Sequence, residues 1–162
     1  MKNSTLIVAL GSALLLLLWG CAASPGRISV KKPIPVLNAP HGLGLRGYDS
    51  VAYFVDGKPG QGSDVFALQW HGATWRFASA EHLAMFTADP VRYAPQFGGY
   101  CAFAISRGTT ADGDPEQWAI VDDQLYVNNN AFAMQLWNRE RDANIAAGKI
   151  NWPLIPKQPA LH

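Results

Sequence analysis

The chain contains only two cysteines, and their positions constrain its fold more than any other feature. Cys21 directly follows an apolar run and a glycine, whereas Cys101 lies inside the sequence Phe97-Gly98-Gly99-Tyr100-Cys101-Ala102. If the first cysteine is consumed by covalent modification, only one thiol remains and no internal disulfide can form. The mature chain must then be held together by a hydrophobic core.

Residues 1–20 are typical of a lipoprotein signal peptide. Lys2 supplies the positive start, and the apolar stretch Leu6–Trp19 covers 14 residues, fewer than the roughly 20 that a membrane-spanning helix needs. We therefore expect cleavage before Cys21 and acylation of its thiol, which would anchor the protein to a lipid bilayer; an uncleaved anchor helix is the alternative. Ala22 in place of Asp favours the outer membrane, with the protein facing the periplasm.

The composition of the mature chain predicts one folded domain with no nucleic-acid partner. Removal of 20 of the 162 residues leaves 142, and because Lys2 is the only charge removed, 12 basic and 12 acidic side chains remain. Nucleic-acid binding needs a concentrated basic face, which this balance does not supply. A globular core is predicted instead by five large aromatic side chains, Trp70, Trp75, Trp118, Trp137 and Trp152.

The chain divides into an anchor, a tether and a domain. Residues 21–46 comprise the lipidated cysteine and a segment rich in proline and glycine, which we expect to be an extended tether. Residues 42–47 match G-x-G-x-x-G, but they lead into a strand-like segment and open no helix, so a dinucleotide site is not expected. The domain is predicted to span residues 47–155, and residues 156–162 to form a tail.

The pattern within the domain predicts a small α+β fold. Expected strands are Ser50–Val55, a hairpin of Phe66–Trp70 with Trp75–Phe77, and a second hairpin of Trp118–Val121 with Leu125–Val127 around Asp122-Asp123. Expected helices are one capped by Ser79 that runs to Ala88, a short one over 101–106, and one capped by Asn130 over 131–141, in which Phe132, Leu136 and Trp137 share a side. This order favours a small antiparallel sheet packed by short helices.

Three motifs resemble the YHS domain family, and in particular its exported branch with a Gly-Gly-Tyr-Cys-Ala sequence. They are Gly47-Tyr48-Asp49-Ser50-Val51-Ala52-Tyr53-Phe54, Trp75-Arg76-Phe77-Ala78-Ser79 and Phe97-Gly98-Gly99-Tyr100-Cys101-Ala102. The resemblance implies a YHS-like α+β domain in which Gly98, Gly99 and Tyr100 form a structural motif. Since some members of the family are thought to carry selenocysteine at the position of Cys101, it also implies a redox-capable or metal-binding chalcogen there.

The main functional hypothesis is the binding or handling of a transition metal. Two glycines before Cys101 and a helix after it favour a thiolate, although a small buried side chain is the alternative. His82 and His71 are the candidate partners, because imidazole with thiolate is a combination that binds copper or zinc.

Two other functions stay open at this stage. Cys101 could serve a thiol-based redox or sensor protein, or the aromatic residues could form a non-catalytic interaction module whose protein partner is unknown. A Cys–His pair would also allow nucleophilic catalysis, but nothing in the spacing identifies a pair, a catalytic residue or a reaction.

Overall fold

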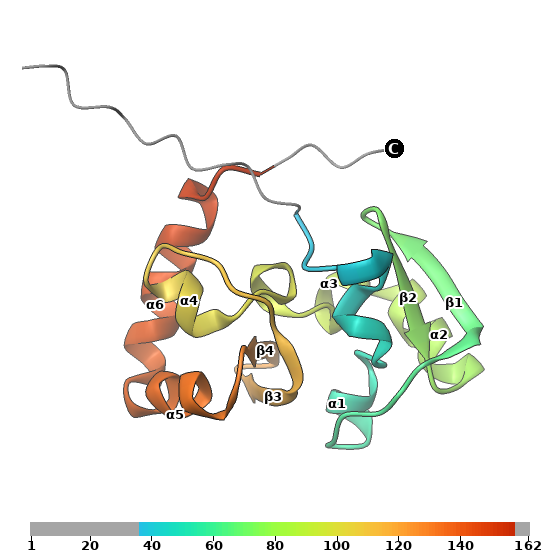
Figure 1. Cartoon of the computed structure of the whole chain (residues 1–162). Helices are drawn as coiled ribbons and strands as arrows, with labels where there is room; N and C mark the ends of the chain where they lie inside the picture. Colours follow the sequence, from blue (N-terminus) through green and yellow to red (C-terminus); the bar gives the residue numbers. More distant parts are fainter. Residues whose placement is uncertain (1–35, 158–162) are drawn as a thin grey trace, which may run out of the picture. The chain divides into compact units, whose positions relative to one another are not determined.

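The computed structural model describes residues 36–157 (Figure 1). Its first part contains the 3-10 turns η1 (Pro40–Gly42) and η2 (Gly44–Gly47), helix α1 (Ala52–Val55), strands β1 (Ser63–Trp70) and β2 (Ala73–Phe77), and helices α2 (Ala80–Ala88) and α3 (Pro90–Tyr93). Its second part contains the turn η3 (Gln96–Gly99), helix α4 (Ala102–Ser106), strands β3 (Asp114–Val121) and β4 (Gln124–Asn128), helices α5 (Ala131–Arg139) and α6 (Arg141–Asn151), and the turn η4 (Trp152–Leu154).

The strands form two antiparallel hairpins, β1–β2 and β3–β4, each of which is a sheet by itself. This confirms the α+β fold with antiparallel strands and short helices, with the strands divided between two sheets rather than joined in one. Each hairpin closes through two residues at positive φ, His71 and Gly72 in one and Asp122 and Asp123 in the other. Turns of this kind match the twist of the flanking strands.

The two parts of the described chain repeat one another. Each begins with a 3-10 turn, followed by a tyrosine that makes an isolated antiparallel bridge: Tyr48 with Gln61, and Tyr100 with Asp112. Each then has a short helix, a hairpin whose register shifts near the start of its first strand, and a nine-residue helix capped by a side chain. We call residues 44–88 the first repeat and residues 96–139 the second.

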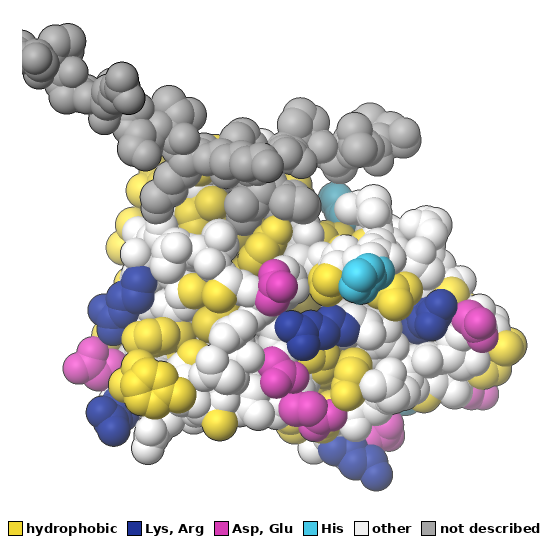
Figure 2. All heavy atoms as spheres, viewed as in Figure 1, with side chains coloured by type: hydrophobic (Ala, Val, Ile, Leu, Met, Phe, Trp, Pro, Cys, Tyr) yellow, Lys and Arg dark blue, Asp and Glu magenta, His cyan; other side chains and the backbone are white. Residues whose placement is uncertain are grey.

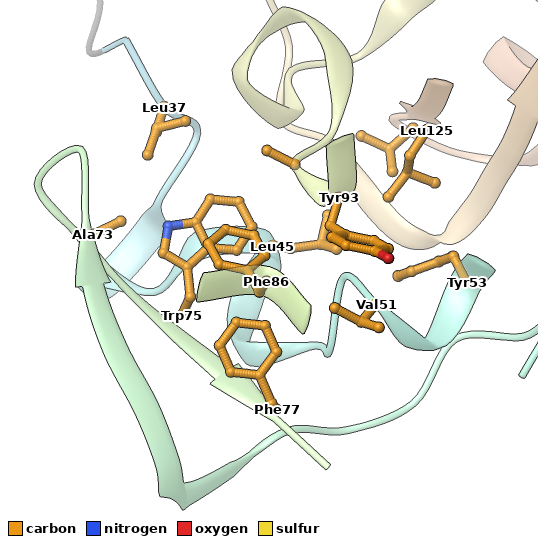
Figure 3. Packing of buried hydrophobic residues seen from close by; sticks show 12 residues of the cluster. Leu37, Leu45, Val51, Tyr53, Ala73, Trp75, Phe77, Phe86, Tyr93 and Leu125 are labelled. Atoms are coloured by element: carbon orange, nitrogen blue, oxygen red, sulfur yellow. The ribbon is translucent and has the colours of Figure 1, made fainter. Parts of the chain in front are cut away.

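Aromatic side chains fill a core that draws mainly on the first repeat (Figure 3). The ring of Phe86 on α2 stacks on Trp75 at 5.1 Å between centroids and lies 5.0 Å from Phe77. Leu125 and Val127 of β4 are buried in the same cluster, so the second hairpin contributes to the core of the first repeat. Burial of such large apolar surfaces is the main stabilising contribution to a domain without disulfides.

A second cluster of buried residues lies under the helices of the second repeat. Trp137 on α5 is fully buried and its ring lies 5.5 Å from that of Tyr126. Helices α4, α5 and α6 pack together, as Figure 1 shows, and Asn144 of α6 donates to the backbone carbonyl of Trp137 at 3.0 Å. The long helix α6 was not expected from the sequence.

The predicted strand Ser50–Val55 is wrong, because helix α1 occupies Ala52–Val55. The residues are strand formers, but the carboxylate of Asp49 accepts hydrogen bonds from the backbone N–H groups of Val51 and Ala52. A side chain that satisfies the first N–H groups of a helix stabilises its start. This local contact outweighs the weak strand preference of the segment.

Two further expectations on helix α5 and the tether differ from the structure. Phe132 does not share the buried side with Trp137; it is 67% exposed, and Ala133 is buried instead. Leu37 and Leu45, placed in the predicted tether, belong to the core, so the folded part begins before residue 47.

The predicted hairpins and three helices are confirmed, with bounds that differ by a few residues. The signal peptide, Cys21, the tether as far as residue 35 and residues 158–162 lie outside the described residues. No helix within residues 36–157 combines the length and apolar character that crossing a bilayer requires.

Candidate functional site

Asp49 is a fully buried carboxylate that ties together three segments of the first repeat. Its Oδ1 accepts from the N–H groups of Val51 at 2.8 Å and Ala52 at 3.3 Å, and its Oδ2 accepts from Ala78 N–H at 2.8 Å. The fourth partner is Nδ1 of His82, at 2.6 Å from Oδ2. The side chain is 0% exposed, so these four partners replace the water that a buried carboxylate loses.

His82 is oriented by this carboxylate and by the start of helix α2. Its backbone N–H donates to Ser79 Oγ at 3.2 Å, which caps the helix, while its ring donates from Nδ1 to Asp49. In the neutral ring this leaves Nε2 without a proton. The side chain is 12% exposed, so the predicted ligand His82 serves first as a structural partner of Asp49.

Cys101 is buried, which differs from the reachable thiolate expected from the sequence. Only 1% of its surface is exposed, and it immediately precedes helix α4. Its Sγ donates to Oδ1 of Asn128 at 3.6 Å, and the same oxygen accepts from Phe103 N–H at 3.0 Å. A thiol that donates and is closed off from solvent has the character of a small buried side chain, the alternative that the sequence left open.

The repeat explains this environment, because Cys101 occupies the position in the second repeat that Asp49 has in the first. Both follow the bridging tyrosine and precede the short helix. Val51 lies two residues after Asp49, and its N–H donates to the Asp49 carboxylate. Phe103 lies two residues after Cys101, and its N–H donates to Oδ1 of Asn128 instead. A thiol and an amide therefore take the place of one carboxylate at the start of helix α4.

His71 lies in the β1–β2 turn and is exposed. It borders a pocket of about 210 Å³, which we call the aromatic pocket. Its wall includes aromatic rings from both repeats and from η4, together with apolar residues: Trp70, Phe97, Trp152, Val91, Pro95 and Leu37. His71 and Gln96, which both have polar side chains, are also among the residues that line the pocket.

Two pairs of rings stand at the border of this pocket. The ring of Trp70 meets that of His71 edge to face, at 4.2 Å between centroids and an interplanar angle of 86°. The ring of Phe97 is tilted by 56° against that of Trp152, at 6.1 Å between centroids. Pockets with apolar and aromatic walls and a few polar groups are the usual form of small-molecule sites. Trp70 and Trp152 are each only half-buried, and Nζ of Lys157 lies over the Trp152 ring at 4.0 Å from its centroid.

The structure does not bring Cys101, His82 and His71 together as one set of metal ligands. Among residues 36–157, no group of three or more His, Cys, Asp or Glu side chains is arranged to hold a metal ion. Cys101 contacts Asn128, His82 contacts Asp49, and His71 borders the aromatic pocket. The described residues therefore do not fit copper or zinc held jointly by these three, and the metal site stays a prediction.

The motif Gly98-Gly99-Tyr100 has a structural position. Both glycines have positive φ, 62° and 78°, and the carbonyl of Gly98 accepts from Asn38 N–H at 2.7 Å. Burial and the charge of Asp112 raise the pKa of Tyr100. The motif therefore joins the segment that enters the domain to the second repeat.

Two residues that organise these environments, Asp49 and Asn128, were not expected from the sequence. An aspartate two residues before Val51 and three before Ala52 is typical of a helix start, which was the available signal for Asp49. Asn128 follows a strand pattern, and no local signal shows that its amide turns toward Cys101.

Comparison of the chain with models of protein families finds no match, and neither do comparisons with curated proteins and with solved structures. The resemblance to the YHS domain thus stays a prediction that rests on the three motifs.

Proposed function

We propose that this protein is a lipid-anchored binding module of the bacterial cell envelope, with a YHS-like domain that takes a small planar molecule in the aromatic pocket. One observation carries the proposal: a pocket of about 210 Å³ bordered by Trp70, Phe97, Trp152 and His71. The metal and redox hypotheses require a grouped donor set or a reachable thiol. Neither feature is present in the described residues.

The size and lining of the pocket limit the ligand. A protein cavity of about 150 Å³ accommodates benzene, so a pocket of about 210 Å³ suits one or two fused rings. Offset and edge-to-face contacts with indole rings favour a flat aromatic molecule. His71 and Gln96 could each form a hydrogen bond with one polar group on its edge.

Binding can be tested with indole as the probe, by saturation-transfer NMR on the full chain carrying Cys21→Ser, which has no thiol to acylate at that position. We expect saturation transfer to indole and a loss of at least tenfold in affinity for Trp152→Ala and His71→Asn. His41→Asn is the matched control, since His41 is also exposed, also has a positive φ and does not border this pocket. Equal binding by the wild-type and Trp152→Ala proteins would refute the proposal.

Anchoring is a separate part of the proposal. Acylation of Cys21 would place the protein in the membrane fraction of the cell, and Cys21→Ser should release it into the soluble periplasmic fraction. Intact-mass spectrometry of the membrane-bound wild-type protein distinguishes anchoring by lipid from anchoring by an uncleaved helix, since only a cleaved and acylated chain begins at residue 21 and carries the added mass of a lipid.

A further inference from the structure

A second pocket, separate from the aromatic pocket, carries charged side chains of both signs. We call it the η1 pocket; its volume is about 270 Å³, and it is bordered by Pro40, His41, Leu43, Arg46 and Asp112. The first four come from η1 and η2, whereas Asp112 comes from the segment that leads into β3. On the face shown in Figure 2, basic, acidic and histidine side chains lie near one another.

The backbone holds the basic side of this pocket in a defined position. His41 and Arg46 both have positive φ, 57° and 55°, which is uncommon for residues other than glycine. The two turns are closed by hydrogen bonds from Leu43 N–H to the Pro40 carbonyl at 3.2 Å and from Tyr48 N–H to the Leu45 carbonyl at 3.0 Å. The backbone positions that carry the imidazole and the guanidinium are therefore fixed before any ligand binds.

Hydrogen bonds also fix the position of Asp112, on the acidic side of the pocket. Asp112 makes the isolated bridge with Tyr100, and its Oδ1 accepts from the amide of Asn38 at 2.6 Å. Its backbone carbonyl accepts from the side-chain amide of Asn129 at 2.9 Å. Because Oδ1 is engaged by Asn38, Oδ2 is the oxygen left for another donor.

Arg46 and Asp112 border one pocket without neutralising each other. Within residues 36–157 the only contact of 4.0 Å or less between a basic and an acidic side chain joins His82 and Asp49, so no such contact links the Arg46 guanidinium to the Asp112 carboxylate. Opposite charges that face a common space but do not touch are complementary to a molecule that carries both charges itself. A guanidinium binds a carboxylate through two parallel hydrogen bonds, and a carboxylate accepts from an ammonium group.

We infer that the η1 pocket binds a small zwitterion of the amino-acid class, with its carboxylate on Arg46 and its ammonium group on Asp112. His41 lies at the same border and could add a hydrogen bond to the carboxylate. The volume is close to the lower end of ligand pockets, about 300 Å³, so a single amino acid suits it better than a longer peptide.

The test uses L-alanine as the probe, in saturation-transfer NMR on the full chain carrying Cys21→Ser. We expect binding of L-alanine, and binding at least tenfold weaker for propionate and for ethylamine, each of which has only one of the two charges. Arg46→Gln and Asp112→Asn should each weaken L-alanine binding by at least tenfold. Asp112→Asn keeps an oxygen for the Asn38 amide, so the fold of this segment is retained.

Lys58→Gln is the matched control, because it removes an exposed positive charge that does not border the pocket. The inference is overturned if L-alanine does not bind, if propionate binds as well as L-alanine, or if both pocket variants bind like the wild-type protein. Indole binding in the aromatic pocket should be unaffected by Arg46→Gln, so failure of this inference and failure of the proposed function are distinguishable.

Discussion

Two glycines with the same kind of backbone conformation, Gly98 and Gly57, differ in how closely their neighbours surround them. Gly98 and Gly57 have similar positive φ, 62° and 67°, yet only Gly98 is enclosed. A Cβ at Gly98 would overlap the backbone carbonyl of Val36, whereas a Cβ at Gly57 would meet nothing within 4 Å. Gly98 thus combines a conformational requirement with a steric one.

Gly98→Ala is expected to destabilise the protein by about 1–3 kcal/mol more than Gly57→Ala. Both substitutions carry the cost of a positive φ, roughly 1–2 kcal/mol, but Gly98→Ala also displaces residues 36–38 and adds an overpacking cost of about 1–3 kcal/mol. Urea denaturation of both variants measures the difference. Equal free energies of unfolding would show that the segment over Gly98 does not contribute to the fold.

Asp49→Asn is expected to lower the free energy of unfolding by about 1–3 kcal/mol, the usual cost of leaving a buried donor without its acceptor. The new amide NH₂ would face two donors, Ala78 N–H and Nδ1 of His82, where a carboxylate oxygen accepts both. Asp56→Asn is the control, since Asp56 is exposed, and it should change stability by less than about 0.5 kcal/mol. A loss below about 1 kcal/mol for Asp49→Asn would contradict its role in joining α1 and α2.

The thiol of Cys101 is expected to react slowly with a disulfide reagent in the native protein and quickly in urea, because it is buried and bonded to Asn128. In the Cys21→Ser chain Cys101 is the only thiol, so the coloured product that the reagent releases measures the reaction of Cys101 alone. Rapid native reaction would instead support the redox or sensor hypothesis.

The helices and hairpins show which elements follow from local sequence. Ser79 and Asn130 precede their helices by one residue and accept from the N–H groups of His82 and Ala133, as their residue types predict. The hairpin turns were also predictable from the polar and glycine residues between apolar runs. Helix α1 has a local signal too, the aspartate before Val51 and Ala52, but the strand formers that follow it favoured the wrong element. The contacts of the same carboxylate with Ala78 and His82, far along the chain, have no local signal.

Ser79→Ala and Asn130→Ala are each expected to cost about 0.5–2 kcal/mol, the usual effect of losing a helix cap. The two caps lie in different repeats and share no hydrogen-bond partner, so the double variant should lose the sum of the two values. Thermal and urea denaturation of the two single variants and the double variant measure this. A strongly non-additive loss would mean that the two helices are coupled more closely than their caps indicate.

The whole molecule depends on contacts between the repeats that no local pattern shows. The hydroxyl of Tyr53 in the first repeat donates to the carbonyl of Pro115 in the second at 3.0 Å, and its ring meets Trp118 edge-on at 5.1 Å. At the surface, Tyr48 donates to Glu116 at 3.0 Å. These contacts hold the start of β3 against α1.

Stability is expected to fall as the pH rises above about 10. Burial, and then the charge of Glu116, raise the pKa of Tyr53 above its ordinary value of 10.0. Above pH 10 the folded state keeps the hydroxyl proton of Tyr53 while the unfolded state releases it. The stabilisation that this hydroxyl gives the folded state is therefore complete below pH 10 and is lost progressively above it.

Tyr53→Phe should lower the free energy of unfolding by about 1 kcal/mol at neutral pH, because it removes the hydrogen bond to Pro115. The free energy of unfolding of this variant should then fall less steeply at alkaline pH than that of the wild type. Urea denaturation between pH 8 and 11 gives both quantities. Parallel declines in the variant and the wild type would indicate that other tyrosines, such as Tyr100 and Tyr126, whose pKa values are also raised by burial, account for the effect.

The sequence by itself determined the α+β class, the hairpins, the capped helices and the glycine motif, because turns, caps and alternating apolar residues act over a few neighbouring positions. Tertiary structure decided the rest. It placed Cys101 beside Asn128, joined Asp49 to His82, and assembled two pockets from residues of both repeats. The physical reason is that the burial and pairing of polar groups depend on segments that are distant in sequence. The two repeats have the same order of elements but carry different residues at equivalent positions.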